Sequence, residues 1–109
     1  MKANALRREP TEAQFTAQVI DFARLHRWRV AHFRASRTKD GWRTAVSGDG
    51  AGWPDLILVR RRMIVVELKV GRGKLRPEQE QWKTALLVAG VDYWIWRPAD
   101  WSGIELVLR

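Results

Sequence analysis

Two short apolar runs give the clearest pattern along the chain. Leu56–Val59 and Met63–Val66 are β-branched or otherwise apolar and have the length of strands, and three consecutive arginines separate them. This pattern predicts a hairpin of two adjacent antiparallel strands. In a hairpin turned at Arg61, residues equally far from the turn lie opposite each other, so we expect Asp55 and Glu67 to be near neighbours.

Helical spacing of apolar residues predicts two helices, one before this hairpin in the sequence and one after it. Thr11 is suited to cap a first helix that runs to about His26, with apolar residues recurring at helical intervals. Pro77 fits the first turn of a second helix, which runs to about Ala89 and ends at Gly90.

The remaining segments predict two more strands and one long connection. Residues 28–33 and 91–96 alternate bulky and polar positions and are interpreted as strands. Ala35 to Ala51 is the longest irregular stretch, and the last segment, from Pro98, is a short helix or a strand. The order helix, strand, strand, strand, helix, strand predicts an α/β domain with a mixed central sheet flanked by helices.

Composition bounds the organisation of the chain. With 109 residues and 46% apolar residues, it has room for one globular domain, 1–109, in which residues 1–10 are expected to form a flexible arm. No run of about 18 apolar residues and no signal-peptide pattern is present, and cysteine is absent. We therefore expect an intracellular, cytoplasmic protein that is not inserted in a membrane.

The charge distribution indicates a polyanionic partner. The net charge is +8; residues 24–43 and 60–76 each hold seven Lys or Arg against one acid, whereas residues 77–109 hold three against five. DNA or RNA is the natural partner of such segments, while a membrane surface is less suitable because no basic amphipathic helix carries the charge. The candidate nucleic-acid contacts are Arg34, Arg37, Lys39, Arg43, Arg72, Lys74 and Arg76. For the 35–51 stretch, a solvated loop is an equally good interpretation.

The carboxylates beside the hairpin suggest metal chemistry. Asp55 and Glu67, with the backbone carbonyl of Leu68, offer hard oxygen ligands that suit Mg²⁺ or Mn²⁺, and no small-molecule cofactor is expected. Lys69 shares the face of Glu67 and can orient an attacking water or stabilise developing charge. Taken singly, Asp55 would more simply cap a strand, and Glu67 and Lys69 would form a surface pair. Their convergence favours the metal site.

The sequence also resembles a nuclease family. Gly52-x-Pro54-Asp55, Glu67-x-Lys69 and Leu75-Arg76-Pro77-Glu78-Gln79-x-x-Trp82 resemble the PD-(D/E)XK superfamily and, within it, the small stand-alone members of the VRR-NUC branch, many of them from phages. The resemblance implies a restriction-endonuclease-like αβββαβ core. It also implies that Glu12 helps to hold the metal, directly or through water, and that Gln79 borders the catalytic pocket and contacts the substrate or the metal-bound water. The alternatives are a helix-dipole role for Glu12 and a surface position for Gln79.

Several other residues have two interpretations each. His32 either contacts a phosphate or a metal-bound water, or is a half-buried histidine satisfied by a neighbour. Trp42 and Trp53 either stack on splayed bases or belong to the core. Gly52 allows either a close approach of the backbone to a ligand or a simple turn. Trp94, Trp96 and Trp101 present more aromatic surface than a small sheet is expected to bury, which suggests a dimer interface.

These features lead to one main functional hypothesis and three alternatives. The main hypothesis is a Mg²⁺- or Mn²⁺-dependent endonuclease that hydrolyses DNA phosphodiesters. By resemblance it is a Holliday-junction or branched-DNA resolvase acting as a homodimer. The alternatives are a flap or non-specific nuclease of the same family, a nucleic-acid-binding module without catalysis, and a sequence-specific restriction-type enzyme, for which the chain is short.

Overall fold

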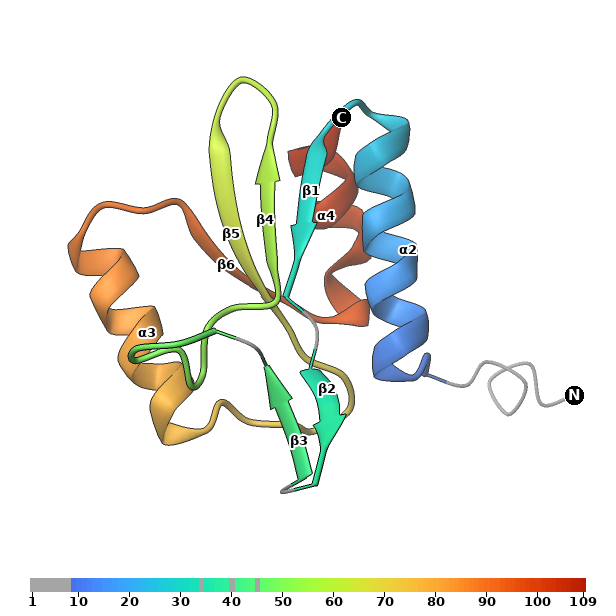
Figure 1. The fold of residues 1–109 in the computed structure, drawn as a ribbon. Helices are drawn as coiled ribbons and strands as arrows, with labels where there is room; N and C mark the ends of the chain where they lie inside the picture. The colour runs from blue at the N-terminus through green and yellow to red at the C-terminus, as the bar shows by residue number, and fades with distance from the viewer. Residues whose placement is uncertain (1–8, 34, 40, 45) are drawn as a thin grey trace, which may run out of the picture.

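The computed structural model describes residues 9–33, 35–39, 41–44 and 46–109. It has an α/β fold (Figure 1). The helices are α2 (Glu12–Leu25), α3 (Pro77–Val88), the short 3₁₀-helix η1 (Pro98–Asp100) and α4 (Trp101–Leu108); the strands are β1 (Arg29–His32), β2 (Ala35–Thr38), β3 (Gly41–Thr44), β4 (Leu56–Val59), β5 (Met63–Leu68) and β6 (Tyr93–Trp96). The predicted α/β fold with a mixed sheet is thereby confirmed.

Four strands form the central sheet in the order β1-β4-β5-β6. The first two pairings are antiparallel, and β6 joins β5 in parallel after the chain has crossed over through α3. In the β4–β5 hairpin, Leu56 is opposite Val66 and Val59 is opposite Met63. This is the register that a turn centred on Arg61 predicts, and it brings the two ends of the hairpin together in the cleft described below.

Local signals begin and end the helices where the sequence predicts. Thr11 caps α2 in a reciprocal pair of hydrogen bonds with Gln14, which satisfies N–H groups that the first turn leaves unpaired. Pro77 occupies the first turn of α3, and Gly90, with a φ of +79°, follows its end.

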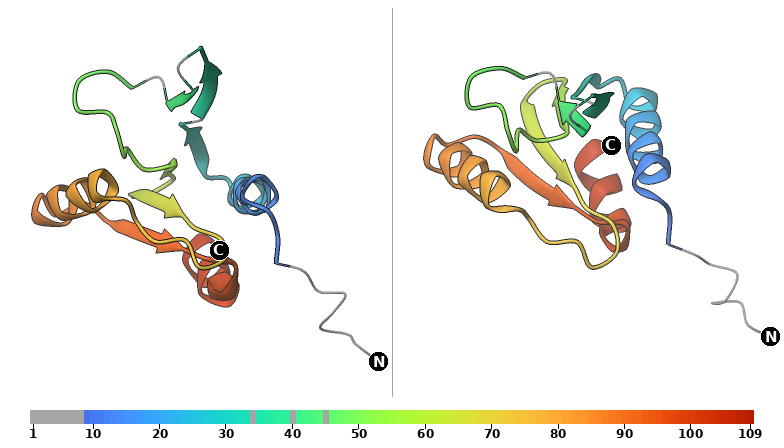
Figure 2. Two further views of the ribbon diagram at one scale, coloured as in Figure 1. Left: turned by 90° about the horizontal axis from the view of Figure 1, so that it is seen from below. Right: turned by 60° about the horizontal axis from the view of Figure 1, so that its bottom comes forward.

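The core lies on one face of the sheet. Leu56, Leu58, Ile64 and Val66 alternate along β4 and β5, are fully buried and pack with residues of α2 and α4. Figure 2 shows α2 and α4 side by side on this face, whereas α3 lies away from them, beside β6. Residues one position along the strands, such as Val65, face the other side.

Two arginines, Arg60 and Arg97, connect distant parts of the fold. Arg60 donates to the carbonyl oxygens of His26 (2.8 Å) and Arg109 (3.0 Å), and its guanidinium lies over the ring of Trp28 (4.7 Å). Arg97 donates to the carbonyl oxygen of Gly73 at 2.7 Å. These cations are thus engaged by the protein itself, and the positive charge available to a partner is smaller than the sequence count suggests.

Three sequence predictions need correction or completion. The stretch predicted to be irregular, Ala35 to Ala51, contains the two-stranded hairpin of β2 and β3, in which Ala35 is opposite Thr44. The last segment is helical, as α4, where the sequence left helix and strand open. The aromatic surplus is also smaller than expected, because Trp96 is buried and only Trp94 and Trp101 are partly exposed.

Within the described residues, no helix is long and apolar enough to cross a membrane.

Candidate functional site

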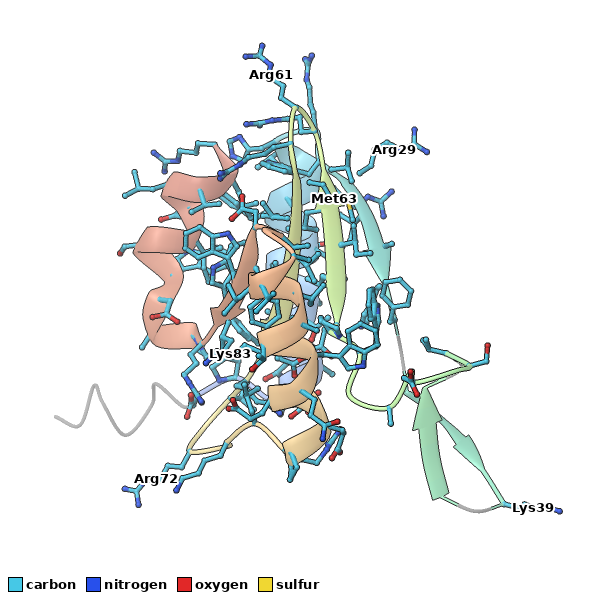
Figure 3. The ribbon with its side chains drawn as sticks, turned by 90° about the vertical axis from the view of Figure 1, so that its left-hand side faces the viewer. Arg29, Lys39, Arg61, Met63, Arg72 and Lys83 are labelled. Atoms are coloured by element: carbon cyan, nitrogen blue, oxygen red, sulfur yellow. The ribbon has the colours of Figure 1, made fainter. Side chains whose placement is uncertain are left out.

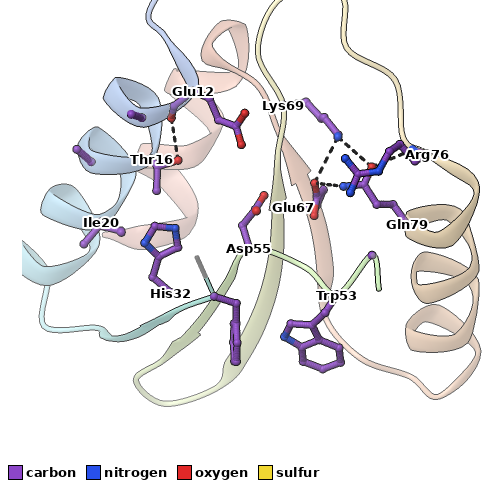
Figure 4. Close-up of a pocket in the computed structure, with 14 residues that line it drawn as sticks. Glu12, Thr16, Ile20, His32, Trp53, Asp55, Glu67, Lys69, Arg76 and Gln79 are labelled. Atoms are coloured by element: carbon purple, nitrogen blue, oxygen red, sulfur yellow. Dashed lines mark hydrogen bonds and ion pairs between the residues drawn. The ribbon is translucent and has the colours of Figure 1, made fainter. Parts of the chain in front are cut away.

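A cleft of about 650 Å³ opens between α2 and the start of α3, where β4 begins and β5 ends (Figure 4). Its lining comes from segments far apart in the sequence: Glu12, Ala13, Thr16, Ala17, Ile20, His32, Phe33, Gly52, Trp53, Asp55, Glu67, Lys69, Arg76 and Gln79. All five residues that the sequence proposed as catalytic are among them.

Asp55 and Glu67 meet at the centre of this cleft. One Asp55 carboxylate oxygen, Oδ2, accepts the backbone N–H of Leu68 at 2.7 Å, which ties the entry of β4 to the exit of β5. Glu67 is only 2% exposed although it carries a carboxyl group. Because the N–H and C=O of one residue in a strand point to the same side, the Leu68 carbonyl lies on the side of Asp55.

Burial and neighbouring negative charge make both carboxyl groups harder to ionise. Burial is the largest cause that raises the pKa of Glu67 to about 8, followed by the neighbouring Asp55 charge; Lys69 opposes the shift. Burial also raises the pKa of Asp55, and the Glu12 charge adds to this, although the Leu68 N–H acts the other way. Without an added cation, too little positive charge therefore lies near the pair to offset the cost of ionising both carboxyl groups.

Lys69 and Gln79 complete the polar end of the cleft. The Lys69 Nζ lies 2.9 Å from the Gln79 Oε1, to which it donates, and 3.6 Å from the Glu67 Oε2. Gln79 is 7% exposed, so the alternative of a surface glutamine is wrong. Its amide group contacts Glu67, Lys69 and the backbone N–H of Arg76, and these contacts fix its orientation.

Glu12 and His32 lie on the α2 side of the cleft. Glu12 is in the first turn of α2, is exposed, and is near enough to Asp55 to raise its pKa. His32 ends β1 and is exposed, where a half-buried position was the favoured alternative. In Figure 4 the Glu12 carboxylate points toward Asp55, and the His32 ring lies between Ile20 and Asp55.

The donor set suits a hydrated divalent ion. Within the described residues, no group of three or more His, Asp or Glu side chains is placed to hold a metal. The ligands available are the two carboxylates and the Leu68 carbonyl, with Glu12 at a greater distance. Mg²⁺ commonly binds through one or two carboxylates while it keeps several waters, so the set fits Mg²⁺ or Mn²⁺ and does not resemble a closed zinc site.

The loop before Asp55 is fastened to α3. The Trp82 Nε1 donates to the carbonyl oxygens of Asp49 (2.9 Å) and Ala51 (3.1 Å). Gly52 has a φ of +82°, and a Cβ there would lie 2.5 Å from the Glu78 carbonyl carbon. Gly52 therefore serves a close approach of this loop to α3, which neither interpretation of this glycine from the sequence included.

The candidate nucleic-acid contacts are partly described. Lys39 is exposed at the tip of the β2–β3 hairpin, and Arg72 is exposed on the loop after β5; Figure 3 shows both at the opposite end of the molecule from Arg61. Lys74 is exposed on the same loop, and Arg76 is exposed and paired with Glu78 at 2.7 Å. Arg34 lies outside the described residues, and Arg37 and Arg43, like Trp42, are described by backbone alone.

One part of the cleft was not predicted. Ala13, Ala17 and Ile20 line it from α2, at helical spacing from one another, and Phe33 lines it from the position after β1. The spacing of positions 13, 17 and 20 by four and then three residues, which places them on one face of a helix, was the available signal in the sequence.

No family model matches the chain, and no curated protein sequence matches it at a significant level.

Proposed function

We propose that this protein is a Mg²⁺- or Mn²⁺-dependent endonuclease that hydrolyses DNA phosphodiesters, with the restriction-endonuclease-like core of the PD-(D/E)XK superfamily and its VRR-NUC branch. The observation that carries the proposal is the Asp55–Glu67 pair. Asp55 directly precedes β4 and Glu67 lies in β5, one position beyond the Leu56–Val66 pair; Glu67 is buried, and its pKa is raised to about 8. A bound divalent cation offsets the cost of ionising these two carboxyl groups. A phosphate alone does not, because it is itself negatively charged.

The residues around the pair have distinct roles in this proposal. Asp55, Glu67 and the Leu68 carbonyl hold the ion, which when bound lowers the pKa of water and stabilises charge on the phosphate. Lys69 orients the attacking water from its position beside Glu67. Gln79 holds Lys69 and Glu67 in place, and Glu12 assists from α2, directly or through water.

The proposed substrate is branched DNA, with the four-way junction first. Support comes from the exposed cations at the cleft end of the molecule, Lys39, Arg72 and Lys74, which contact phosphates without reading bases. A homodimer would place two sites on one junction. A groove of about 520 Å³ between β6 and α4, beside the 76% exposed Leu106, is the surface we assign to that contact.

Cleavage of labelled substrates tests the proposal. A four-way junction, a flap and a plain duplex are incubated with Mg²⁺, Mn²⁺ or EDTA, using the native protein, Glu67→Ala, and Glu80→Ala as a control on the exposed side of α3. Paired nicks across the junction that require metal and are lost only in Glu67→Ala are expected. Cutting of flaps or duplex alone would support the nuclease hypothesis and contradict the resolvase hypothesis.

A binding module without catalysis is the second candidate, favoured by the same exposed cations. The variant Lys69→Ala separates the two. If the protein is a nuclease, this variant binds DNA nearly as well as the native protein and does not cut it. If native protein and variant bind equally and neither cuts with any metal, the binding module is the better description.

A further inference from the structure

The loop between β5 and α3 carries two exposed cations next to the cleft. Lys69 and Arg76, near its two ends, line the cleft, and Arg72 and Lys74 lie between them in the sequence. The side chains of Arg72 and Lys74 are exposed, and neither makes an ion pair within the described residues. In Figure 3, Arg72 extends outward from this end of the molecule. The two cations are therefore available to phosphates that lie just outside the cleft.

The backbone of this loop has little support of its own. Residues 71–74 read Gly-Arg-Gly-Lys, and Gly71 has a φ of +59°. In the part of the chain that the structure describes, one backbone–backbone hydrogen bond holds these four residues, from the Gly73 N–H to the Val70 carbonyl oxygen at 3.2 Å. Glycine loses more conformational freedom on ordering than any other residue. Local contacts alone therefore give this loop no single shape.

Two side chains from distant parts of the sequence bind the loop backbone. Glu9, just before α2, accepts the N–H of Gly71 through its Oε1 at 3.0 Å. Arg97, just after β6, donates to the carbonyl oxygen of Gly73 at 2.7 Å and to that of Gly71 at 3.4 Å. An arginine suits this use because its N–H donors have a fixed relative geometry. Arg72 thus lies between two residues that one guanidinium holds.

The same loop runs beside the side chain of Lys69. A Cβ at Gly73 would lie 3.8 Å from the Lys69 Cδ and 3.3 Å from the Val70 carbonyl oxygen. The backbone N–H of Lys69 donates to the Trp96 carbonyl oxygen at 3.0 Å, and Arg97 is the next residue. The end of β6 therefore holds both the backbone of Lys69 and the loop beside its side chain.

We infer that residues 71–74 form a phosphate-binding loop and that Arg97 and Glu9 are its positioning residues. The loop contacts phosphates next to the one that is cut, and this part of the inference rests on the proposed nuclease function. Arg97 acts through the loop and not by direct contact with nucleic acid. It orders Arg72 and Lys74 before DNA binds, so that the free-energy cost of ordering the loop does not weaken binding.

A double-mutant cycle tests whether Arg97 acts through the loop. The affinity for a labelled flap or junction is measured with Ca²⁺ in place of Mg²⁺ for native protein, Arg97→Ala, Arg72→Ala/Lys74→Ala and the triple variant. Arg97→Ala should weaken binding by about tenfold, the scale of ordering one loop residue. The triple variant should bind as the Arg72→Ala/Lys74→Ala variant does, because no cation is left to position. If Arg97→Ala has no effect, or if the two losses multiply, the inference is wrong.

Further variants separate positioning from charge. Arg97→Lys keeps the charge and one donor for the Gly73 carbonyl, so it should recover part of the affinity that Arg97→Ala loses. Arg61→Ala removes an exposed arginine at the opposite end of the molecule and should change the affinity by less than about twofold. Glu9→Gln keeps an acceptor for the Gly71 N–H and should bind more tightly than Glu9→Ala. Equal affinities of these two Glu9 variants would contradict the role of Glu9.

Amide hydrogen exchange without DNA keeps this inference distinct from the nuclease proposal. The N–H groups of residues 71–74 should exchange faster in Arg97→Ala than in native protein, and those of β4 and β5 should not change. Unchanged exchange in the loop would overturn the inference and leave the nuclease proposal intact. If Mn²⁺ does not raise the melting temperature and no substrate is cut, the nuclease proposal fails. Coupling of Arg97 with Arg72 and Lys74 in the binding cycle would then still support the loop as a nucleic-acid site.

Discussion

Gln79 donates its amide N–H to the Glu67 carboxylate at 2.9 Å, and the oxygen of the same amide accepts the Lys69 ammonium at 2.9 Å. One side chain from α3 thus sets the position of two neighbours on β5. A third bond, from the backbone N–H of Arg76 to the same oxygen, fixes the amide in the first turn of its helix. Gln79 is therefore a positioning residue that links α3 to the chemistry of the sheet.

Gln79→Ala should lower the rate of cleavage by about 10- to 100-fold, the usual scale for loss of a residue that orients the groups around a metal. The affinity for DNA should change by less than about twofold, because Gln79 is buried and the cations outside the cleft remain. Loss of the bond to Arg76 should also lower the free energy of unfolding by about 1 kcal/mol. Single-turnover kinetics of Gln79→Ala, with Glu80→Ala as the control, measures the cleavage rate. An unchanged rate in Gln79→Ala would contradict the prediction.

Glu67→Gln should stabilise the metal-free protein. The amide keeps the shape of the side chain and can accept from Gln79, but it removes the cost of protonating a carboxyl group whose pKa is raised to about 8 in the folded protein by burial and by Asp55. We expect the free energy of unfolding in EDTA at neutral pH to rise by about 2–3 kcal/mol. Chemical denaturation of both proteins tests this, and an equally large loss of stability would show that the Glu67 charge is well compensated.

The same carboxyl group makes the stability of the native protein depend on pH. The pKa of Glu67 is higher in the folded state than the ordinary value of 4.5. The contribution of this group to the free energy of unfolding is therefore full below pH 4.5 and is lost as the pH rises toward about 8. In EDTA, the native protein should therefore lose stability over this range, and Glu67→Gln should lose less. Melting temperatures of the two proteins at a series of pH values provide the comparison.

Mn²⁺ should raise the melting temperature of the native protein. An ion that binds only the folded state adds about 2.7 kcal/mol at 100 times its dissociation constant. Asp55→Ala and Glu67→Ala should abolish the rise, and Asp21→Ala, an exposed acid elsewhere on α2, should retain it. An undiminished rise in Asp55→Ala would place the ion at another site.

Gly52→Ala should destabilise the protein by more than about 2 kcal/mol, because a Cβ at this position would lie 2.5 Å from the Glu78 carbonyl carbon and because φ is +82°. Gly48 is the matched control. Its φ is +69°, but a Cβ there meets nothing within 4 Å among the described residues, so Gly48→Ala should cost only about 1 kcal/mol. Urea denaturation gives both values, and equal losses would mean that the contact with α3 has little effect.

The local elements could be predicted from the sequence. The β4–β5 register followed from two apolar runs and a turn, because a hairpin pairs residues by their distance from its centre. This register was enough to bring Asp55 and Glu67 together. The start of α2 and both ends of α3 also followed from residues next to them in sequence, Thr11, Pro77 and Gly90. In each case the determining contacts span a few residues or one hairpin.

The cleft was decided by contacts between distant segments. Its lining combines residues of α2 with the loop that carries Trp53, a relationship that no local pattern contains. The burial of Gln79 depends on how α3 meets β5, and the role of Gly52 depends on the carbonyl group of a residue 26 positions later. The β2–β3 hairpin was missed because these short, mostly polar strands lack the apolar alternation that a buried face requires. The sequence by itself determined which groups could bind a metal, since that depends on residue type and hairpin spacing, and the tertiary structure decided what lies beside them, since that depends on the packing of whole elements.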